Sequence, residues 1–524
     1  MLSSLDISIV VLYALGLFVI AQWVSREKSG HQKNTQDYFL ASKSLPWWAI
    51  GASLIAANIS AEQIIGMSGS GYAIGLAIAS YEWMAAITLI LVGKYLLPIF
   101  LRRGIYTMPQ FLEQRYDHRV RMVMAFFWLG VYIFVNLTSV LWLGALALNA
   151  VAGLDIVIGM VLLGLFAIAY SLYGGLKAVA FTDIIQVVLL VLGGLLIAWV
   201  MLDKVADGAG VLAGFQLLTE RAPEKFDMIL SSDNPHYMSL PGLSVLIGGM
   251  WIMNLSYWGF NQYIIQRALA AKNIQEAQKG IVFAAFIKLL MPVIVVLPGI
   301  AIFVLSPTLD TPDHAYPMAM TLLPTGIKGL VFAALLAAIV SSLASMTNSI
   351  STIFTMDIYS SFISKPDDSG KQVLVGRIVA LSAMLLAMIC AKPLLGNFDQ
   401  AFQYIQEFTG FFTPGIVVIF LLGMFWKKTT SSAALAAAIG SAVLSFAFKM
   451  LWPELPFIDR VGLVFLLCTA LAVLISMQAD SYKQGLDQQG AVELGDITFA
   501  TTGGFNLSAL LVSLILVALY ASWW

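Results

Sequence analysis

Polar side chains interrupt an apolar stretch at residues 52–75. The stretch begins with the pattern of a membrane helix and then contains four polar residues, Asn58, Ser60, Glu62 and Gln63. A carboxylate at bilayer depth costs about 2.5 to 3.5 kcal/mol on insertion scales, so it is retained where protein or a watery cavity receives it. We therefore expect a binding site at this interruption.

A second apolar stretch, WIMNLSYWGFNQYIIQR at residues 251–267, is interrupted in the same way. It interleaves amides with aromatic rings, and its polar members include Asn254, Ser256, Asn261 and Gln262. Two polar-broken helices in corresponding positions of two halves are typical of an inverted-repeat transporter, with substrate and ion near the midplane. The pattern predicts one repeat at 47–203 and a second at 241–425.

Hydroxyl side chains crowd a third apolar stretch at residues 341–352. They and one amide are Ser341, Ser342, Ser345, Thr347, Asn348, Ser349, Ser351 and Thr352. Na+ is a hard cation that binds oxygen ligands, and neutral hydroxyls and carbonyls also let it leave. Small polar residues equally favour close helix packing. The interruption near 56–59 adds free carbonyls, and the two features together favour an ion site.

Few charges lie within the apolar stretches, and their opposite signs predict mutual pairing. They are Glu62, Glu82, Lys94, Asp183, Lys288 and Glu407. A sugar needs carboxylates, ammonium groups and amides for its hydroxyls and an aromatic ring for its face, which Glu82, Lys288 and Tyr257 could supply. The alternative is a structural ion pair between Glu82 and Lys288 without a ligand. For Glu62 and Glu407 we favour a structural role.

Asp183 follows the segment YGGLKAVAFTD, in which Gly174 and Gly175 permit a tight reversal between two helices. Three roles for its carboxylate stay open. It could bind a second cation, carry a proton, or cap the next helix.

The composition requires a membrane setting. Hydrophobic residues make up 60% of the 524 residues, charged residues 11%, and the mean hydropathy is +0.88. These values exclude one soluble core. Apolar stretches long enough to span a bilayer predict about fourteen transmembrane helices in a single polytopic domain, 1–524. They lie at 5–25, 47–75, 78–101, 119–150, 155–173, 178–203, 241–268, 275–305, 326–360, 372–394, 398–425, 431–451, 457–478 and 505–523.

Loop charge predicts the orientation of these helices. Most of the 28 lysines and arginines fall in the odd-numbered loops. Those in the even-numbered loops are Lys204, Arg221, Lys225, Lys328, Lys392, Lys449 and Arg460. Positively charged loops normally stay in the cytoplasm, so both termini are expected outside. The net charge of -1 and the scattered basic residues give no support for nucleic-acid binding.

Several strings resemble the sodium:solute symporter family. The family-wide signatures are Tyr173 to Leu176, Ala178, Val179, Thr182, Asp183 and Gln186, then Ser341, Ser342, Ser345, Asn348 and Ser349. Strings of the sodium/glucose branch, most closely its bacterial sodium/galactose members, are ASLIAANISAEQIIGMSGSGY (52–72), SYEW (80–83), WGFNQYIIQR (258–267), FTMDIY (354–359) and QAFQYIQE (400–407). The resemblance covers residues 36–430.

This resemblance implies a LeuT-type fold, five plus five inverted-repeat helices with flanking helices, including peripheral ones at 431–523. It implies import of a hexose with Na+ by alternating access across the bacterial cytoplasmic membrane. The residues implied to hydrogen-bond the sugar are Gln63, Glu82, Asn254, Lys288 and Gln406. The implied outer gate is Met67, Tyr81 and Phe402, and Tyr257 is the inner gate that stacks on the sugar. The implied Na+ ligands are the carbonyls of Ala56, Ile59 and Ala338 and the hydroxyls of Ser341 and Ser342, while Asn58 bridges the two sites.

Other solutes and other classes of protein stay open. Ala85 stands where galactose-type members have a serine, so the resemblance leaves the hexose undecided. The solute could also be myo-inositol, another polyol or a sugar acid; a sugar acid normally requires an arginine, and we expect none inside a span. A channel or a substrate sensor is a further alternative, although no segment predicts a sensor's soluble output domain. No catalytic triad emerges, so an enzyme is not expected.

Overall fold

The computed structural model describes residues 2–24, 40, 43–362, 369–396, 401–479 and 490–524. These residues are nearly all helical, and their one β-bridge joins Leu45 to Ala271. Within them, nine helices are long and apolar enough to cross a membrane, or up to eleven if each of two bent pairs is one span. The prediction of a helical membrane protein is confirmed, whereas the count of fourteen spans stays a prediction.

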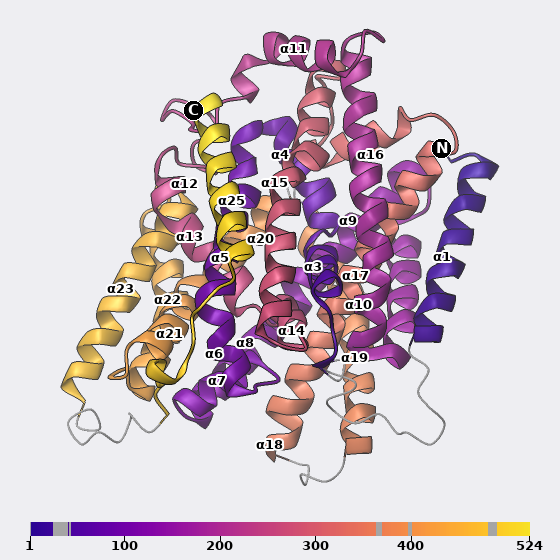
Figure 1. Cartoon of the computed structure of the whole chain (residues 1–524). Helices are drawn as coiled ribbons and strands as arrows, with labels where there is room; N and C mark the ends of the chain where they lie inside the picture. The colour runs from indigo at the N-terminus through magenta and orange to yellow at the C-terminus, as the bar shows by residue number, and fades with distance from the viewer. Residues whose placement is uncertain (1, 25–39, 41–42, 363–368, 397–400, 480–489) are drawn as a thin grey trace.

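The helices follow one another along the whole chain (Figure 1). In the first half they are α1 (Ser4–Val24), α3 (Trp47–Asn58), η2 (Glu62–Gly66), α4 (Met67–Ala73), η3 (Leu76–Ala79), α5 (Ser80–Leu91), η4 (Val92–Leu96), α6 (Leu97–Arg103), α7 (Met108–Arg115), α8 (His118–Val131), η5 (Tyr132–Leu137), α9 (Thr138–Ala152), α10 (Ile156–Val205) and α11 (Val211–Arg221). In the second half they are α12 (Ser244–Ile247), α13 (Gly249–Leu255), η7 (Ser256–Phe260), α14 (Gln262–Leu269), α15 (Ile274–Leu305), α16 (Ala315–Thr321), α17 (Ile327–Ile353), η9 (Phe354–Tyr359), α18 (Ser360–Phe362), α19 (Ser369–Leu395), α20 (Ala401–Gly410), α21 (Thr413–Phe425), α22 (Ser431–Leu451), α23 (Phe457–Gln478) and α25 (Gly503–Ser522).

The first predicted interruption is a true break between helices. α3 ends at Asn58, and the chain restarts at Glu62 with a bend of 60°. The hydroxyl of Ser60 accepts a hydrogen bond from the backbone N–H of Glu62 (3.1 Å), so a side chain stabilises the new helix start. The last carbonyls of a helix have no partner in the same helix, so the break frees the carbonyls of α3 for other contacts.

The second predicted interruption is also a break, and it is more extensive. The π-helical turn η7 ends at Phe260, and Asn261 adopts an extended conformation (φ −82°, ψ 123°) before α14 begins. A further irregularity at Gly248 separates α12 from α13. Irregular backbone at membrane depth is tolerated where it is buried in protein or lines a cavity. Both breaks therefore mark the interior of the bundle as the place for a site.

The long helix α15 packs along both halves of the first broken span. A Cβ atom built on Gly280 would lie 2.8 Å from the carbonyl oxygen of Trp47, and one on Gly299 would lie 2.1 Å from that of Ser68. Only glycine allows this approach of α15 to α3 and to α4. On the other side, α17 packs against α10 and α3. The break in α3 thus lies between α15 and α17.

Some predictions about boundaries need comment. The predicted span 398–425 is bent by 47° between α20 and α21, where Gly410 and Pro414 flank the bend. Sequence reasoning missed this bend, although glycine at a helix end and proline in a first turn are its usual signals. The expected reversal at Gly174 and Gly175 falls within 170–179 of α10, whose side chains lie outside the described residues.

Different helices lie at the two ends of the bundle. α1 begins and α25 ends near the same end, which α11 covers, whereas α7 and α14 lie towards the other end (Figure 1). α11 (Val211–Arg221) and α7 (Met108–Arg115) are both short helices that lie outside the predicted spans.

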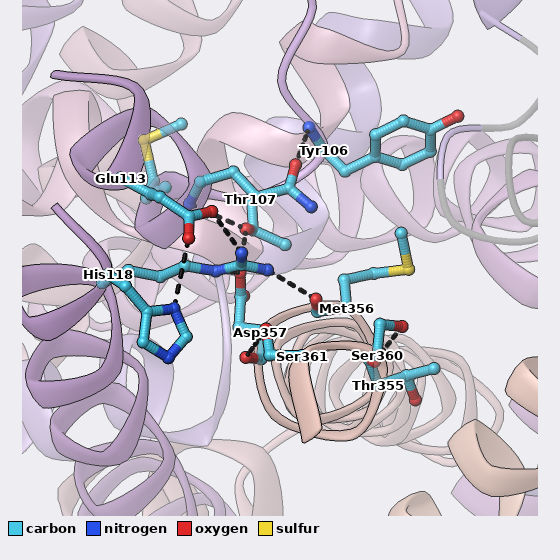
Figure 2. Close-up of polar contacts among 12 residues, drawn as sticks. Tyr106, Thr107, Glu113, His118, Thr355, Met356, Asp357, Ser360 and Ser361 are labelled. Atoms are coloured by element: carbon cyan, nitrogen blue, oxygen red, sulfur yellow. Dashed lines mark hydrogen bonds and ion pairs between the residues drawn. The ribbon is translucent and has the colours of Figure 1, made fainter. Parts of the chain in front are cut away.

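A buried ion-pair cluster ties α7 and α8 to η9. Arg121 Nε donates to Asp357 Oδ1 (2.9 Å), which also accepts a hydrogen bond from Thr107 Oγ1 (3.0 Å). Arg121 also contacts Glu113, whose other oxygen lies 3.2 Å from His118 Nδ1 (Figure 2). Asp357 belongs to the string FTMDIY. Among the described residues, Asp357 of this string therefore has a structural role, because it holds η9 against α7 and α8.

Candidate functional site

The side chains from the two broken spans meet in one small cavity, which we call the central cavity. Its volume is about 50 Å³. Six of the residues expected to bind substrate line it: Asn58, Gln63, Glu82, Asn254, Tyr257 and Gln406. They come from α3, η2, α5, α13, η7 and α20, so the fold brings together segments that are far apart in the sequence.

Lys288, the seventh expected residue, lies behind Glu82. Its ammonium group donates to Glu82 Oε2 at 2.5 Å and also to the side-chain oxygen of Asn58. The Lys288 side chain is fully buried and that of Glu82 is 3% exposed. Removing one member of a buried pair leaves an uncompensated charge and typically costs about 3 to 5 kcal/mol. The predicted pairing is confirmed, and it positions the carboxylate at the cavity wall.

The pair extends into a hydrogen-bond chain that ends on Tyr257. Asn58 Nδ2 donates to Tyr257 Oη (2.9 Å), and Tyr263 Oη donates to the same oxygen (2.7 Å). The Lys288 ammonium also lies 5.0 Å from the ring centroid of Trp258. Tyr257 is thus held on two sides by α3 and α14, with its ring against the cavity.

Several polar atoms of the central cavity have no protein partner among the described residues. They are the side-chain oxygen of Gln63 and the hydroxyl of Tyr81, both buried. Asn254 uses its amide N–H to donate to the carbonyl of Met250 (3.1 Å). Buried polar groups are nearly always hydrogen-bonded in folded proteins, so orphaned groups facing one cavity indicate a polar ligand or water.

An aromatic contact closes one side of the central cavity. The rings of Tyr81 and Phe402 pack edge to face with centroids 5.2 Å apart. A Cβ atom on Gly66 would lie 2.9 Å from the Cβ of Phe402, so α20 rests directly on the broken span. Met67 follows Gly66 and is fully buried. The three residues expected as an outer gate are therefore buried next to the cavity or its walls.

The present volume sets a limit on what the cavity holds in this conformation. One water molecule needs about 10 to 15 Å³ of cavity volume, so a cavity of about 50 Å³ holds a few waters. Pockets that bury drug-sized ligands begin at about 300 Å³. A sugar therefore requires the walls of the cavity to move apart.

The hydroxyl cluster of α17 faces the broken end of α3. Ser342 Oγ donates to the carbonyls of Ala57 (3.2 Å) and Ala56 (3.4 Å). Ile59, the residue directly after α3, and Ala338, one turn before Ser342 on α17, are both fully buried. The structure joins Ala56 to Ser342 directly, and the other three expected ligands, Ile59, Ala338 and Ser341, lie near them in sequence on the same two segments.

Asp183 completes this group of oxygens, which we call the oxygen cluster. Its carboxylate accepts hydrogen bonds from Ser341 on α17 and from Ser53 on α3, the latter at 2.5 Å. Asp183 is fully buried inside α10, where its carboxylate accepts from two side-chain hydroxyls of other helices and interacts electrostatically with the Arg267 guanidinium. This contact pattern does not correspond to a helix cap. Carbonyl, hydroxyl and carboxylate oxygens are the ligands that a hard cation such as Na+ requires.

Arg267 corrects one sequence prediction. We expected no arginine inside a span, yet the predicted span 241–268 contains Arg267, and its side chain is fully buried. Its guanidinium donates to the backbone and side-chain oxygens of Ser53 (3.1 and 3.0 Å) and also contacts Ser345. Arg267 lies on α14, which begins after the break at Asn261 and is buried along its length. It lies at the oxygen cluster and does not line the central cavity.

Glu407 and Glu62 differ although we expected a structural role for both. Glu407 Oε1 pairs with Lys449 (2.8 Å) and Arg460 (3.0 Å), which fits that expectation. Glu62 lines a second cavity, and among the described residues its Oε1 atom has no hydrogen-bond partner.

Comparison with known proteins adds independent findings. The family model for the sodium:solute symporter family matches residues 38–440. The chain is 51% identical over 540 residues to the sodium/glucose cotransporter of Vibrio parahaemolyticus, covering 100% of this chain and 99% of that protein. It is 33% identical over 503 residues to the sodium/myo-inositol cotransporter of Mus musculus, covering 86% and 68%.

A solved structure shares the fold. The substrate-bound, outward-open Na+-coupled sialic acid symporter superposes with a TM-score of 0.80 at 24% identity, covering 91% of this chain and 98% of that one. At this identity the likeness shows the fold alone. The matches to cotransporters identify Na+ as the coupling ion and a small molecule as the cargo. The chain therefore belongs to the sodium:solute symporter family and is a transporter rather than an enzyme.

Proposed function

We propose that this protein imports a hexose together with Na+ by alternating access. The observation that carries the proposal is the central cavity, where the Glu82–Lys288 pair, several amides and the Tyr257 ring face one another. Sugar hydroxyls donate to carboxylates and accept from amides, and a sugar ring packs on an aromatic face. The 51% identity to a protein named as a sodium/glucose cotransporter supports a hexose.

Each residue of the central cavity has a proposed role. Tyr257 stacks on the sugar and forms the inner gate, and the contact of Tyr81 with Phe402, together with Met67, forms the outer gate. Asn58 links the cavity to the broken end of α3 through its bonds to Lys288 and Tyr257. The sugar is hydrogen-bonded by Gln63, Glu82, Asn254, Lys288 and Gln406.

The proposed Na+ site lies at the break in α3. Its ligands are the carbonyls of Ala56, Ile59 and Ala338 and the hydroxyls of Ser341 and Ser342. The hydrogen bonds from Ser342 to the carbonyls of α3 support this assignment, because a cation between them would replace those bonds with metal–oxygen contacts. Asp183 supplies negative charge next to this site, where a second cation or a coupling role is proposed.

Coupling follows from the position of the break. Na+ on the outer side ties α3 to α17 and favours the outward-open state, which then binds sugar more tightly. A ligand shifts a conformational equilibrium only by its differential affinity for the two states, and typical couplings are about 1 to 3 kcal/mol. Na+ and the sugar therefore shift the same conformational equilibrium.

The membrane arrangement remains part of the proposal. It has inverted repeats at 47–203 and 241–425, peripheral helices at 431–523, both termini outside and a bacterial cytoplasmic membrane. The basic residues of the odd-numbered loops support this orientation. The two broken spans support the repeats, since such spans occupy corresponding positions in inverted-repeat transporters.

Myo-inositol is the second candidate substrate. The 33% identity to a protein named as a sodium/myo-inositol cotransporter favours it, and a ring of hydroxyls satisfies the same amides and carboxylate. A sugar acid has less support because no arginine lines the central cavity. Arg267 serves the oxygen cluster instead.

Uptake into proteoliposomes tests the proposed function. Radiolabelled galactose and glucose are supplied with and without an inward Na+ gradient, and unlabelled galactose, glucose, myo-inositol and sialic acid compete. The proposal expects uptake that requires the gradient and is blocked best by one hexose. Uptake blocked best by myo-inositol would favour the second candidate, and uptake independent of Na+ would refute coupling.

A further inference from the structure

A second cavity lies on the far side of Tyr257 from the central cavity. Its volume is about 70 Å³, and Met253, Tyr257 and Gln406 line both cavities. The two cavities therefore share a wall, and the central residue of that wall is the one proposed as the inner gate. Movement of the Tyr257 side chain would join them.

Two buried acceptors that face the second cavity have no hydrogen-bond partner among the residues that the structure describes. They are Glu62 Oε1 and Asn136 Oδ1, from residues that are 7% and 5% exposed. They come from η2 and η5, two π-helical turns on different spans, and π-helical turns frequently occur at functional sites. Leaving a buried acceptor without a donor is costly, so these atoms require donors from a ligand or from water.

A chain of hydrogen bonds forms the floor of the second cavity. Tyr132 Oη donates to Asn261 Oδ1 (2.5 Å) and accepts a hydrogen bond from the backbone N–H of Gln262 (2.8 Å). The side chain of Gln262 in turn bonds the backbone of Tyr106 (3.0 Å) and Met108 (2.8 Å). Met108 begins α7, so this chain of hydrogen bonds links the wall of the second cavity to the end of the bundle that carries α7 and α14 (Figure 1).

The chemistry of the walls selects the class of ligand. Phe127, Trp128 and Tyr132 supply aromatic surface, while Glu62, Asn136 and Gln406 supply acceptors and an amide. A neutral polyhydroxyl ring satisfies both kinds of wall, because its hydroxyls donate and its faces stack.

We propose that this cavity is a second binding station for the transported sugar, occupied after the sugar passes Tyr257 and before it leaves the protein. Glu62 and Asn136 accept hydrogen bonds from its hydroxyls there. The proposal rests on the proposed hexose transport and extends it, because it assigns the neighbouring cavity to the same substrate.

Transport measured from both faces of the membrane tests this station. Labelled galactose uptake is measured in intact cells and in inside-out membrane vesicles that contain the protein, with equal Na+ on both sides. For Glu62→Gln, we expect the half-saturating galactose concentration to rise about tenfold in inside-out vesicles, the effect of weakening one hydrogen bond to the sugar. In intact cells it should change less than about twofold.

Two further variants keep the test decisive. Asn136→Leu removes the other acceptor with a side chain of similar size. It should raise the half-saturating galactose concentration in inside-out vesicles only, and it keeps the test available if Glu62→Gln fails to reach the membrane. Glu82→Gln, the matched change in the central cavity, should impair both faces. Equal effects of Glu62→Gln on both faces, or no effect on either, would show that the second cavity holds water only. If wild-type cells show no Na+-dependent uptake, the proposed function fails first and this inference with it.

Discussion

The central cavity, the proposed sugar site, and the oxygen cluster, the proposed ion site, are built from different kinds of atoms. The cavity uses side chains that are rare in membranes, above all the buried pair Glu82–Lys288, and leaves some of its polar atoms without partners. The oxygen cluster uses hydroxyls and backbone carbonyls that already bond one another, as Ser342 does with Ala57. A sugar site needs specific directional groups, whereas an ion site needs only enough oxygens at one place.

The two regions meet at the break in α3. The side chain of Asn58 bonds Lys288 and Tyr257 at the cavity, while the carbonyls of Ala56 and Ala57, two and one residues earlier, bond Ser342 at the oxygen cluster. A shift of this short segment therefore changes both regions together. This connection gives the proposed coupling a physical path.

The largest expected effect comes from Lys288→Ala. It leaves the Glu82 carboxylate buried without its partner, so we expect loss of about 3 to 5 kcal/mol of stability and loss of sugar uptake. Uptake and thermal unfolding are measured at matched membrane levels. Lys279→Ala, at an exposed lysine of the same helix α15, serves as the control and should transport normally. Uptake at the wild-type rate in Lys288→Ala would separate the ion pair from sugar binding.

Gln406→Ala should abolish uptake with little change in stability. Gln406 is only partly buried and lines the central cavity, so its loss removes a partner of the sugar without leaving a charge unpaired. Gln403→Ala, one turn away on α20 and outside that cavity, is the matched control. If the two variants take up sugar equally well, Gln406 has no direct role.

Ser342→Ala should have the smallest effect and act on the other region. Removing one neutral hydroxyl typically costs about 1 kcal/mol, so the Na+ concentration for half-maximal uptake should rise about fivefold. Uptake at saturating Na+ should persist. Ser349→Ala is the control, because Ser349 lies on the same helix but bonds Gln266. It tests whether the loss of any hydroxyl from α17 raises the Na+ concentration for half-maximal uptake. An unchanged Na+ dependence in Ser342→Ala would count against this ion site.

The sequence predicted the central cavity better than its surroundings, and the reason is the type of residue involved. Glu82, Lys288 and Asn58 are costly in a membrane, so their presence alone indicates a site. The breaks after Asn58 and at Asn261 were predictable from the same polarity.

Other features depend on tertiary structure and were harder to predict. Arg267 lies in the predicted span 241–268, but only the fold shows that its guanidinium contacts Ser53 and Ser345. The orphaned oxygen of Glu62 was unpredictable, since a carboxylate next to amides has the same sequence pattern whether or not a partner reaches it. Backbone ligands such as the carbonyl of Ala56 carry no residue signature, so the resemblance to the family supplied them.

The most direct test of the proposed coupling is sugar binding to the purified protein with and without Na+. Binding of labelled galactose and glucose is measured by equilibrium dialysis in Na+ and in choline, for the wild-type protein and for Ser342→Ala. We expect Na+ to lower the dissociation constant about tenfold in the wild type, a coupling of about 1.4 kcal/mol, and distinctly less in the variant at the same Na+ concentration. Equal dissociation constants in Na+ and choline for a sugar that does bind would contradict the account, because the break in α3 would then not connect the ion to the sugar.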